Sequence, residues 1–251
     1  MSSLNIASLA CGLIFAATLF GAFLRTKLPE HHLSGDSKDV IKLGIALIAT
    51  MSALVLALLF SATRSSFERT TALVSRMTVD VRELDSLLIE YGPEAKPMRI
   101  SLRTEVNKMI DSVWVENALA RGVTPDTGPH GGTVLYGLRS LQPTTTVQKS
   151  IQDRAILVST DLYQTLLTLT SQPSDLISNT FILVLVLWLM FIFAVFAMSS
   201  KINPTMITVL CLCIMSASAA IYLILELDQP FDGLMQVSDH PLRSIISEEI
   251  N

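Results

Sequence analysis

Four long stretches without formal charge constrain this chain more than any other feature of its sequence. They cover residues 4–24, 43–62, 176–198 and 204–225. An α-helix needs about 20 apolar residues to cross the hydrocarbon core of a bilayer. A backbone in lipid must satisfy its own hydrogen bonds, and these stretches lack the alternation of barrel strands. They therefore predict four transmembrane helices.

The overall composition agrees with a membrane protein. Of 251 residues, 50% are hydrophobic and only 16% are charged, whereas about a quarter of the residues in soluble proteins are charged. The net charge of −4 gives no reason to expect nucleic acid, which would need a basic face. The expected partner is the lipid bilayer, because of the four apolar stretches. The three cysteines, Cys11, Cys211 and Cys213, lie within apolar stretches. We expect them to act as small hydrophobic residues and to form no disulfide framework.

The first apolar stretch begins close to the N-terminus, where a signal peptide is the alternative to a transmembrane helix. No Lys or Arg precedes it, and its length of about 20 residues exceeds that of a signal-peptide core. Ala10-Cys11-Gly12 is faintly similar to a lipoprotein cleavage site, but the apolar stretch continues well beyond Cys11. We expect a retained helix.

The spacing of the four stretches divides the chain into unequal parts. Residues 1–62 hold the first pair of spans, residues 176–227 hold the second pair, and residues 228–251 form a C-terminal tail. Residues 63–175 contain twelve of the eighteen Lys and Arg residues. The sequence predicts an all-α protein with four transmembrane helices and a helical extramembrane domain between spans two and three.

Helical periodicity runs through most of the polar domain and predicts helices at 64–91, 97–120 and 144–171. No Pro or Gly separates the first of these from span two, so one helix is expected to continue out of the membrane as far as Tyr91. Residues 122–143 are rich in Gly and Pro and are expected to form a loop. The last helix carries a 4-3-4-3-4 spacing typical of packing on other helices, formed by Ile151, Ala155, Val158, Leu162, Thr165 and Leu169.

Lys and Arg near the ends of the spans are the usual guide to orientation, because cytoplasmic loops carry an excess of them. Five lie on one side, namely Arg25, Lys27, Lys38, Lys42 and Lys201, and five on the other, namely Arg64, Arg69, Arg76, Arg154 and Arg243. The tally favours neither orientation.

Few residues suggest catalysis or a metal site. The first loop contains acidic and histidine residues that could bind a divalent ion, namely Glu30, His31, His32, Asp36 and Asp39. A hydrated loop is the simpler interpretation of these residues. His130 lies among glycines, where a surface loop is again the simpler interpretation. No phosphate-binding loop, no helical pair of His ligands and no nucleophile with a visible base is present. We expect neither an enzyme nor a cofactor.

Two carboxylates follow the fourth span, at Glu226 and Asp228. Acidic groups at the C-terminal end of a helix oppose its macrodipole. Hydration or a structural salt bridge would explain them, and so would an ion-related role. Pro230 and Phe231 then turn the chain away from the span.

Three segments carry a resemblance to a known family. Leu-Glu-Leu-Asp-Gln-Pro-Phe-Asp-Gly at 225–233 is similar to the C-terminal hallmark of the bestrophin-like family of prokaryotic membrane proteins, a domain of unknown function. Ser-Gly-Asp-Ser-Lys-Asp-Val at 34–40 and Tyr-Gly-Pro-Glu at 91–94 also resemble that family. The similarity covers nearly the whole chain in order and spacing. It singles out Glu226, Asp228, Pro230, Phe231 and Gly233 as family-motif residues.

The resemblance implies a function, because the family is distantly related to bestrophins, which are pentameric anion channels. It implies a homo-oligomer (a pentamer by analogy) that conducts inorganic ions, with its helical domain in the cytoplasm and its spans in a bacterial inner membrane. In the animal channels, a Pro-Phe-Gly segment helps to hold calcium. Here Asp232 interrupts that order and no acidic cluster follows, which argues against calcium gating.

In bestrophins the second span lines the pore, so its counterpart is the candidate pore wall here. One helical stripe of this span is formed by Gly44, Ile48, Met51, Ser52, Val55 and Leu59. The alternative is that the stripe packs on a neighbouring helix, as small residues do in lipid. Arg64 and Arg69 are candidates for a positive pore mouth, or for side chains that reach lipid headgroups.

Two classes of function remain open from the sequence. The first is an oligomeric anion channel. The second is a non-conducting scaffold or sensor whose helical domain binds a partner protein. The scarcity of charge in the spans favours the second class, since transport routes usually place ionisable groups within the membrane.

Overall fold

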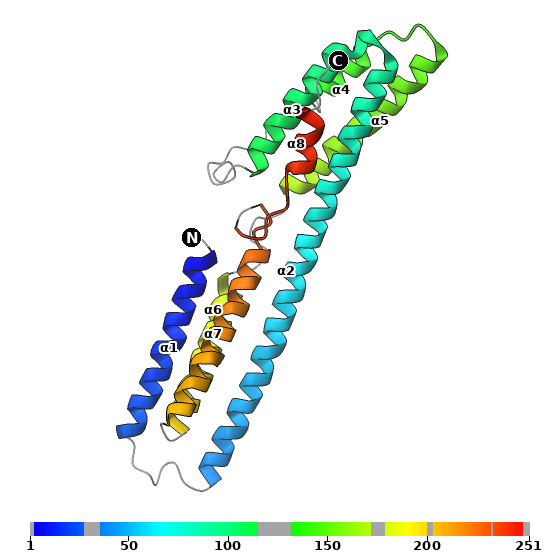
Figure 1. The fold of residues 1–251 in the computed structure, drawn as a ribbon. Coiled ribbons are helices and arrows are strands. Elements are labelled where there is room, and N and C mark those ends of the chain that lie inside the picture. The colour runs from blue at the N-terminus through cyan, green and yellow to red at the C-terminus, as the bar shows by residue number, and fades with distance from the viewer. Residues whose placement is uncertain are drawn as a thin grey trace. The chain divides into compact units, whose positions relative to one another are not determined.

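The computed structural model of the protein describes residues 3–27, 36–114, 132–171, 179–199, 203–231 and 233–247. Within these ranges all regular structure is helical (Figure 1). A short 3-10 helix at Pro93–Ala95 joins α2 to α3. The α-helices are α1 (Ser3–Lys27), α2 (Asp36–Tyr91), α3 (Lys96–Trp114), α4 (Gly132–Ser140), α5 (Thr146–Ser171), α6 (Asn179–Ser199), α7 (Pro204–Leu227) and α8 (His240–Ser247).

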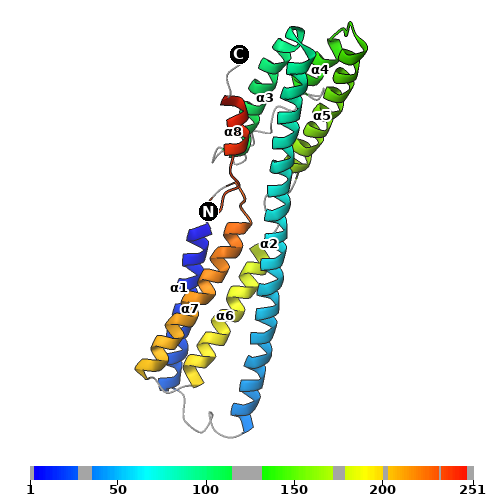
Figure 2. The same cartoon turned by 45° about the vertical axis from the view of Figure 1, so that its right-hand side comes forward.

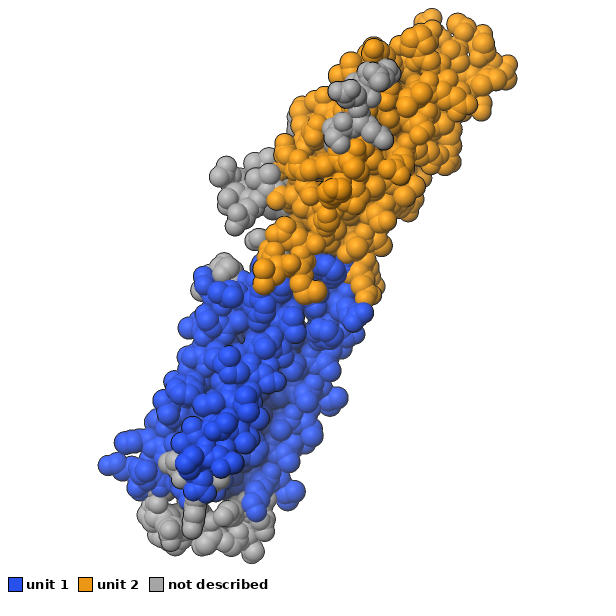
Figure 3. Space-filling view, in the orientation of Figure 1, with its two compact units in different colours: residues 1–67, 175–229 blue, residues 68–174, 230–251 orange. Residues whose placement is uncertain are grey.

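The chain divides into two compact units. The membrane unit comprises residues 1–67 and 175–229, and the helical unit comprises residues 68–174 and 230–251 (Figure 3). Within the part of the chain that the structure describes, four helices are long and apolar enough to cross a membrane: α1, α2, α6 and α7. The predicted four-span, all-α architecture with helices between spans two and three is therefore confirmed. Residues 176–178 of the predicted third span lie outside the described ranges.

The helix that contains span two continues without a break for 56 residues, or about 84 Å at 1.5 Å per residue. No Gly or Pro follows Gly44 until Gly92, so nothing in the sequence interrupts the backbone hydrogen bonds. The prediction of one continuous helix ending at Tyr91 is confirmed. Gly92 has a φ of +118°, a conformation that favours glycine, and Pro93 follows it.

In the membrane unit, α1, α6, α7 and the first half of α2 run side by side (Figure 2). All four helices contribute to one apolar cluster, which includes Ala10, Leu59, Leu185 and Ile221. Helix α1 approaches α6 so closely that a Cβ atom at Gly21 would overlap the backbone carbonyl of Ala194. Small residues permit this close approach, which is the usual basis of helix association in lipid.

The outward faces of the same helices carry large apolar side chains. Leu43 on α2 is 72% exposed and Leu183 on α6 is 70% exposed. Exposed apolar surface on this scale marks contact with lipid or with another protein. The burial pattern therefore agrees with helices that lie in a bilayer.

The helical unit is built on two regular seams. On α2 the buried positions repeat at steps of four and three, namely Thr70, Val74, Met77, Val81, Leu84, Leu88 and Tyr91. On α5 all residues of the predicted seam are buried except Leu162, which is half-buried. This alternation is typical of helices that pack along their length, and the predicted role of α5 is confirmed.

One expectation was wrong, because residues 132–140 of the predicted loop form α4. Val134, Leu135 and Leu138 are buried, and the helix packs against α3 and α5. The Glu105 carboxylate on α3 accepts hydrogen bonds from the backbone N–H groups of Thr133 and Val134. A distant residue therefore caps this short helix, which the local sequence does not reveal. Residues 115–131 lie outside the described ranges.

Candidate functional site

The family motif begins with a buried carboxylate at the end of α7. Glu226 is only 2% exposed, and the Ser3 hydroxyl donates a hydrogen bond to its Oε2 at 2.9 Å. This bond joins the first residue of α1 to the last turn of α7. Because ionisable residues buried in membrane spans are costly and commonly functional, Glu226 is the strongest candidate site residue of the membrane unit.

Asp228 ends α7 and begins the turn that follows. Its backbone N–H donates to the carbonyl of Ile224 at 3.2 Å, and the N–H of Gln229 donates to the carbonyl of Glu226 at 3.3 Å. These bonds satisfy two of the carbonyl groups that a helix end leaves open. Among the described residues, no three His, Cys, Asp or Glu side chains gather as a metal site.

In the helical unit, the second half of the motif is attached to α3. The Trp114 ring meets the Phe231 ring edge to face, with centroids 5.2 Å apart, a favourable aromatic geometry. Trp114 also donates its indole N–H to the carbonyl of Val237 at 2.7 Å. The N–H of Val237 donates to the carbonyl of Pro230 at 2.8 Å. These contacts close residues 230–237 into a loop, and Gly233 supplies its left-handed φ of +92°.

The tail continues into α8, which packs on α3 through Leu242 and Ile245. Arg243 forms a short ion pair with Asp239 one turn earlier. It also lies 3.9 Å from an Asp111 oxygen on α3. Arginine is charged at every physiological pH, and the hydrogen bond to Asp239 raises the pKa of the Arg243 guanidinium further. The tail is thus held by an apolar face and by charge.

Two residues of these sites were missed in the sequence. Trp114 falls within the helix predicted at 97–120 but was not singled out there as a site residue, and Ser3 was not recognised. A buried tryptophan usually places its N–H on an acceptor, so Trp114 carried a weak signal. Nothing in the sequence indicated that Ser3 meets Glu226, since 223 positions separate them.

The candidate pore stripe on α2 is partly covered within the chain itself. Ser52 and Leu59 are buried and Ile48 and Val55 are half-buried, whereas Gly44 and Met51 are exposed. Ile48 packs against a cluster formed with α6, and Val55 and Leu59 belong to the cluster shared by all four membrane helices. These contacts agree with the packing alternative. The pore role of the stripe stays a prediction.

The residues of the candidate pore mouth lie on the same helix. Arg64 and Arg69 are both exposed. They are five positions apart, which places their side chains about 140° apart around an α-helix. The two arginines therefore do not share one face of α2, and their contributions must be tested separately.

Glu30, His31, His32, His130 and Asp232 lie outside the described ranges. Asp36 and Asp39 fall within α2, but their side chains are outside the description. The proposed ion-binding group of the first loop stays a prediction.

The fold and these sites define the class of protein: an all-helical, multi-pass membrane protein whose last span leads into a tail attached to a helical unit. The bestrophin-like domain matches residues 12–242. The chain belongs to the bestrophin-like family, as the motif residues suggested. No curated protein and no solved structure shows significant similarity to it.

Proposed function

We propose that this protein is an oligomeric, anion-conducting channel of a bacterial inner membrane, and not an enzyme. The match of the bestrophin-like domain to nearly the whole chain carries this proposal. A single four-helix subunit, whose inner faces are filled by its own side chains, leaves little room for a pore. Conduction is therefore expected in a ring of subunits, with five as the number suggested by analogy.

The unbroken helix α2 supports a role for span two in such a ring. One of its faces packs within the chain, while the opposite face exposes large apolar side chains, namely Leu43, Leu47, Met51, Leu54 and Leu58. Apolar rings can gate a pore by dewetting, and charged rings at its mouth select ions. Exposed arginines beyond span two would concentrate anions there.

The test is ion flux from liposomes that contain the purified full-length protein, under chloride gradients and then under potassium gradients. We expect chloride flux, and a reduced chloride preference in Arg64→Ala or Arg69→Ala. Arg82→Ala is the matched control, because Arg82 is an exposed arginine further along α2. No flux of either ion from a well-folded oligomer would refute the proposal. Chloride flux from protein that is shown to be monomeric in the liposomes would refute the oligomeric pore.

The alternative proposal is a non-conducting scaffold or sensor whose helical unit binds a partner protein. The burial of Ser52 and Leu59 within the chain favours it, because these residues were candidates for the pore wall. It predicts an intact protein that is silent in the flux assay. It also predicts that substitutions on exposed faces of α3 to α5 abolish partner binding without changing the fold of the spans.

A further inference from the structure

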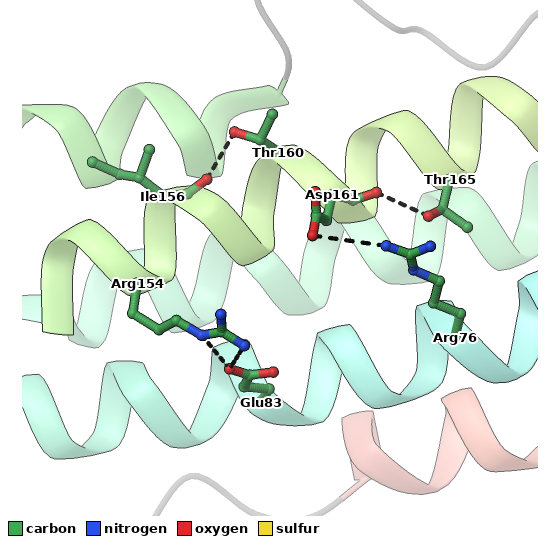
Figure 4. A network of polar contacts seen from close by, with 7 residues as sticks. All are labelled: Arg76, Glu83, Arg154, Ile156, Thr160, Asp161 and Thr165. Carbon is green, nitrogen blue, oxygen red and sulfur yellow. Dashed lines mark hydrogen bonds and ion pairs between the residues drawn. The ribbon is translucent and has the colours of Figure 1, made fainter.

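Helices α2 and α5 of the helical unit are joined by two ion pairs (Figure 4). Arg76 on α2 lies 3.8 Å from a carboxylate oxygen of Asp161 on α5. Arg154 on α5 lies 2.6 Å from a carboxylate oxygen of Glu83 on α2. The members of the two pairs are seven residues apart on each helix and run in opposite order. The pairs therefore show that α2 and α5 run antiparallel, with position 76 opposite 161 and position 83 opposite 154.

Asp80 lies on α2 between these two ion pairs. It is four residues after Arg76 and three before Glu83, so all three side chains share one face of the helix. The register places Leu157 opposite Asp80, and Leu157 is an apolar residue that is 60% exposed. Asp80 thus lies at the edge of the α2–α5 contact, between the two ion pairs, and the residue across from it is apolar.

The environment of Asp80 disfavours its charged form. Its Oδ2 atom is buried and has no hydrogen-bond partner among the described residues. Burial raises the pKa of this carboxyl, the negative charges of Asp161 and Glu83 raise it further, and the positive charges of Arg76 and Arg154 oppose the shift. A buried polar atom without a partner carries a free-energy cost, and ionisation increases that cost.

We propose that Asp80 is a protonation switch of the contact between α2 and α5. With the carboxyl neutral, the two helices pack more firmly. With the carboxyl ionised, the contact opens more readily. The inference concerns the helical unit alone and does not rest on the proposed channel activity.

The direction of the pH effect follows from the raised pKa. The closed contact binds the proton of Asp80 more tightly than an opened contact, in which the carboxyl has its ordinary pKa of about 3.9. Acidification through the raised pKa therefore stabilises the closed contact. Stability gained in this way is lost as the pH rises through that pKa, and it levels off below the ordinary pKa.

The test is hydrogen exchange of the full-length protein, with protection of the α5 amides measured from about pH 7.5 to about pH 3.5, below the ordinary pKa of the carboxyl, and corrected for the intrinsic exchange rates. Protection near residues 154–161 should rise on acidification in the wild type. Each pKa unit of difference corresponds to about a tenfold change in the opening equilibrium. Asp80→Asn should give high protection at every pH, because asparagine resembles the neutral acid.

Asp153→Asn is the matched control. Asp153 is an acid of α5 that pairs with Lys149 on its own helix and is well exposed. This variant should keep the pH dependence of the wild type. An unchanged pH dependence in Asp80→Asn would overturn the proposal. Lower protection in Asp80→Asn than in the wild type at neutral pH, or failure of the variant to fold, would also overturn it. At neutral pH the wild-type carboxyl is ionised, so the proposal requires the neutral asparagine to stabilise the contact.

Discussion

The membrane unit and the helical unit are both built from α-helices, but different contacts hold their helices together. In the membrane unit, α1 and α6 meet through small residues such as Gly21 and Ala194. In the helical unit, α2 and α5 carry regular apolar seams flanked by ion pairs such as Arg154–Glu83. Large apolar residues face outward in the first unit, whereas charged residues occupy many of the exposed positions in the second.

The difference reflects the solvent of each unit. In water, burial of apolar side chains drives helices together, so a helix needs one apolar stripe and a polar exterior. In lipid that driving force is absent, so association depends on close backbone approach and on a few polar contacts. Substitutions should therefore act through backbone clashes in one unit and through lost apolar burial in the other.

The largest effect is expected from Gly21→Val in the membrane unit. Added side-chain atoms would overlap the carbonyl group of Ala194, which belongs to the α6 backbone and cannot move aside locally. We expect α1 and α6 to separate, with a large loss of monodisperse protein in detergent by size-exclusion chromatography. Gly12→Val is the control, because a Cβ at Gly12 meets nothing within 4 Å. Equal behaviour of the two variants would contradict close packing of α1 on α6.

The second effect tests the core of the helical unit. Leu84 is fully buried on α2, and removal of a buried leucine side chain costs about 2–5 kcal/mol. Leu84→Ala should therefore lower the denaturation midpoint of the helical unit, followed by circular dichroism or by limited proteolysis. The exposed Leu157 provides the comparison, since Leu157→Ala should change stability by less than about 1 kcal/mol. A similar loss in both variants would argue against the seam.

The third effect separates a side-chain clash from the backbone clash at Gly21. A Cβ at Gly137 on α4 would overlap the Met98 side chain on α3. Methionine is flexible, so Gly137→Ala should cost only about 1–3 kcal/mol. The double variant Gly137→Ala/Met98→Ala should recover part of that loss in thermal unfolding. Additive losses in the double variant would show that the two residues do not meet.

The fourth effect concerns the attachment of the tail to α3. Trp114→Phe keeps an aromatic ring near Phe231 but removes the N–H that binds the Val237 carbonyl. A hydrogen bond of this kind contributes about 0.5–1.5 kcal/mol. Hydrogen exchange of residues 233–247 should accelerate by about twofold to tenfold, while α1 and α6 remain unchanged. Unchanged exchange of the tail would show that the indole bond does not hold it.

The smallest effect is expected for the exposed ion pair between α2 and α5. Arg154 and Glu83 are both partly exposed, and such pairs contribute about 0.2–1 kcal/mol. A double-mutant cycle with Arg154→Ala and Glu83→Ala should give a coupling energy in that range, and added salt should reduce it. A coupling energy near zero would mean that the apolar seams alone align the two helices.

Local sequence patterns were sufficient to predict most of the helices. The four uncharged stretches predicted the spans because length and apolar character are what lipid requires. The absence of Gly and Pro predicted the continuity of α2, and the spacing from Ile151 to Leu169 predicted the buried face of α5. These features depend on residues close together in the chain, so they can be read without knowledge of the fold.

Tertiary structure was needed where distant residues decide the outcome. Helix α4 was missed because its apolar positions are few and its N-terminal cap is Glu105 of another helix. Helical periodicity revealed the stripe from Gly44 to Leu59 on α2. The sequence did not show that side chains of α1, α6 and α7 cover part of this stripe. Periodicity gives the apolar face of a helix and does not give its neighbour.

The sequence by itself determined the solvent of each segment, the number of spans, the continuous α2 helix and the family motif. Only the tertiary structure placed Ser3 on Glu226, attached the tail through Trp114, and set Asp80 between two ion pairs. The physical reason is the range of the interactions. Hydrophobic periodicity and helix propensity act over one or two turns, whereas a hydrogen bond or an ion pair joins any two residues that the fold brings together.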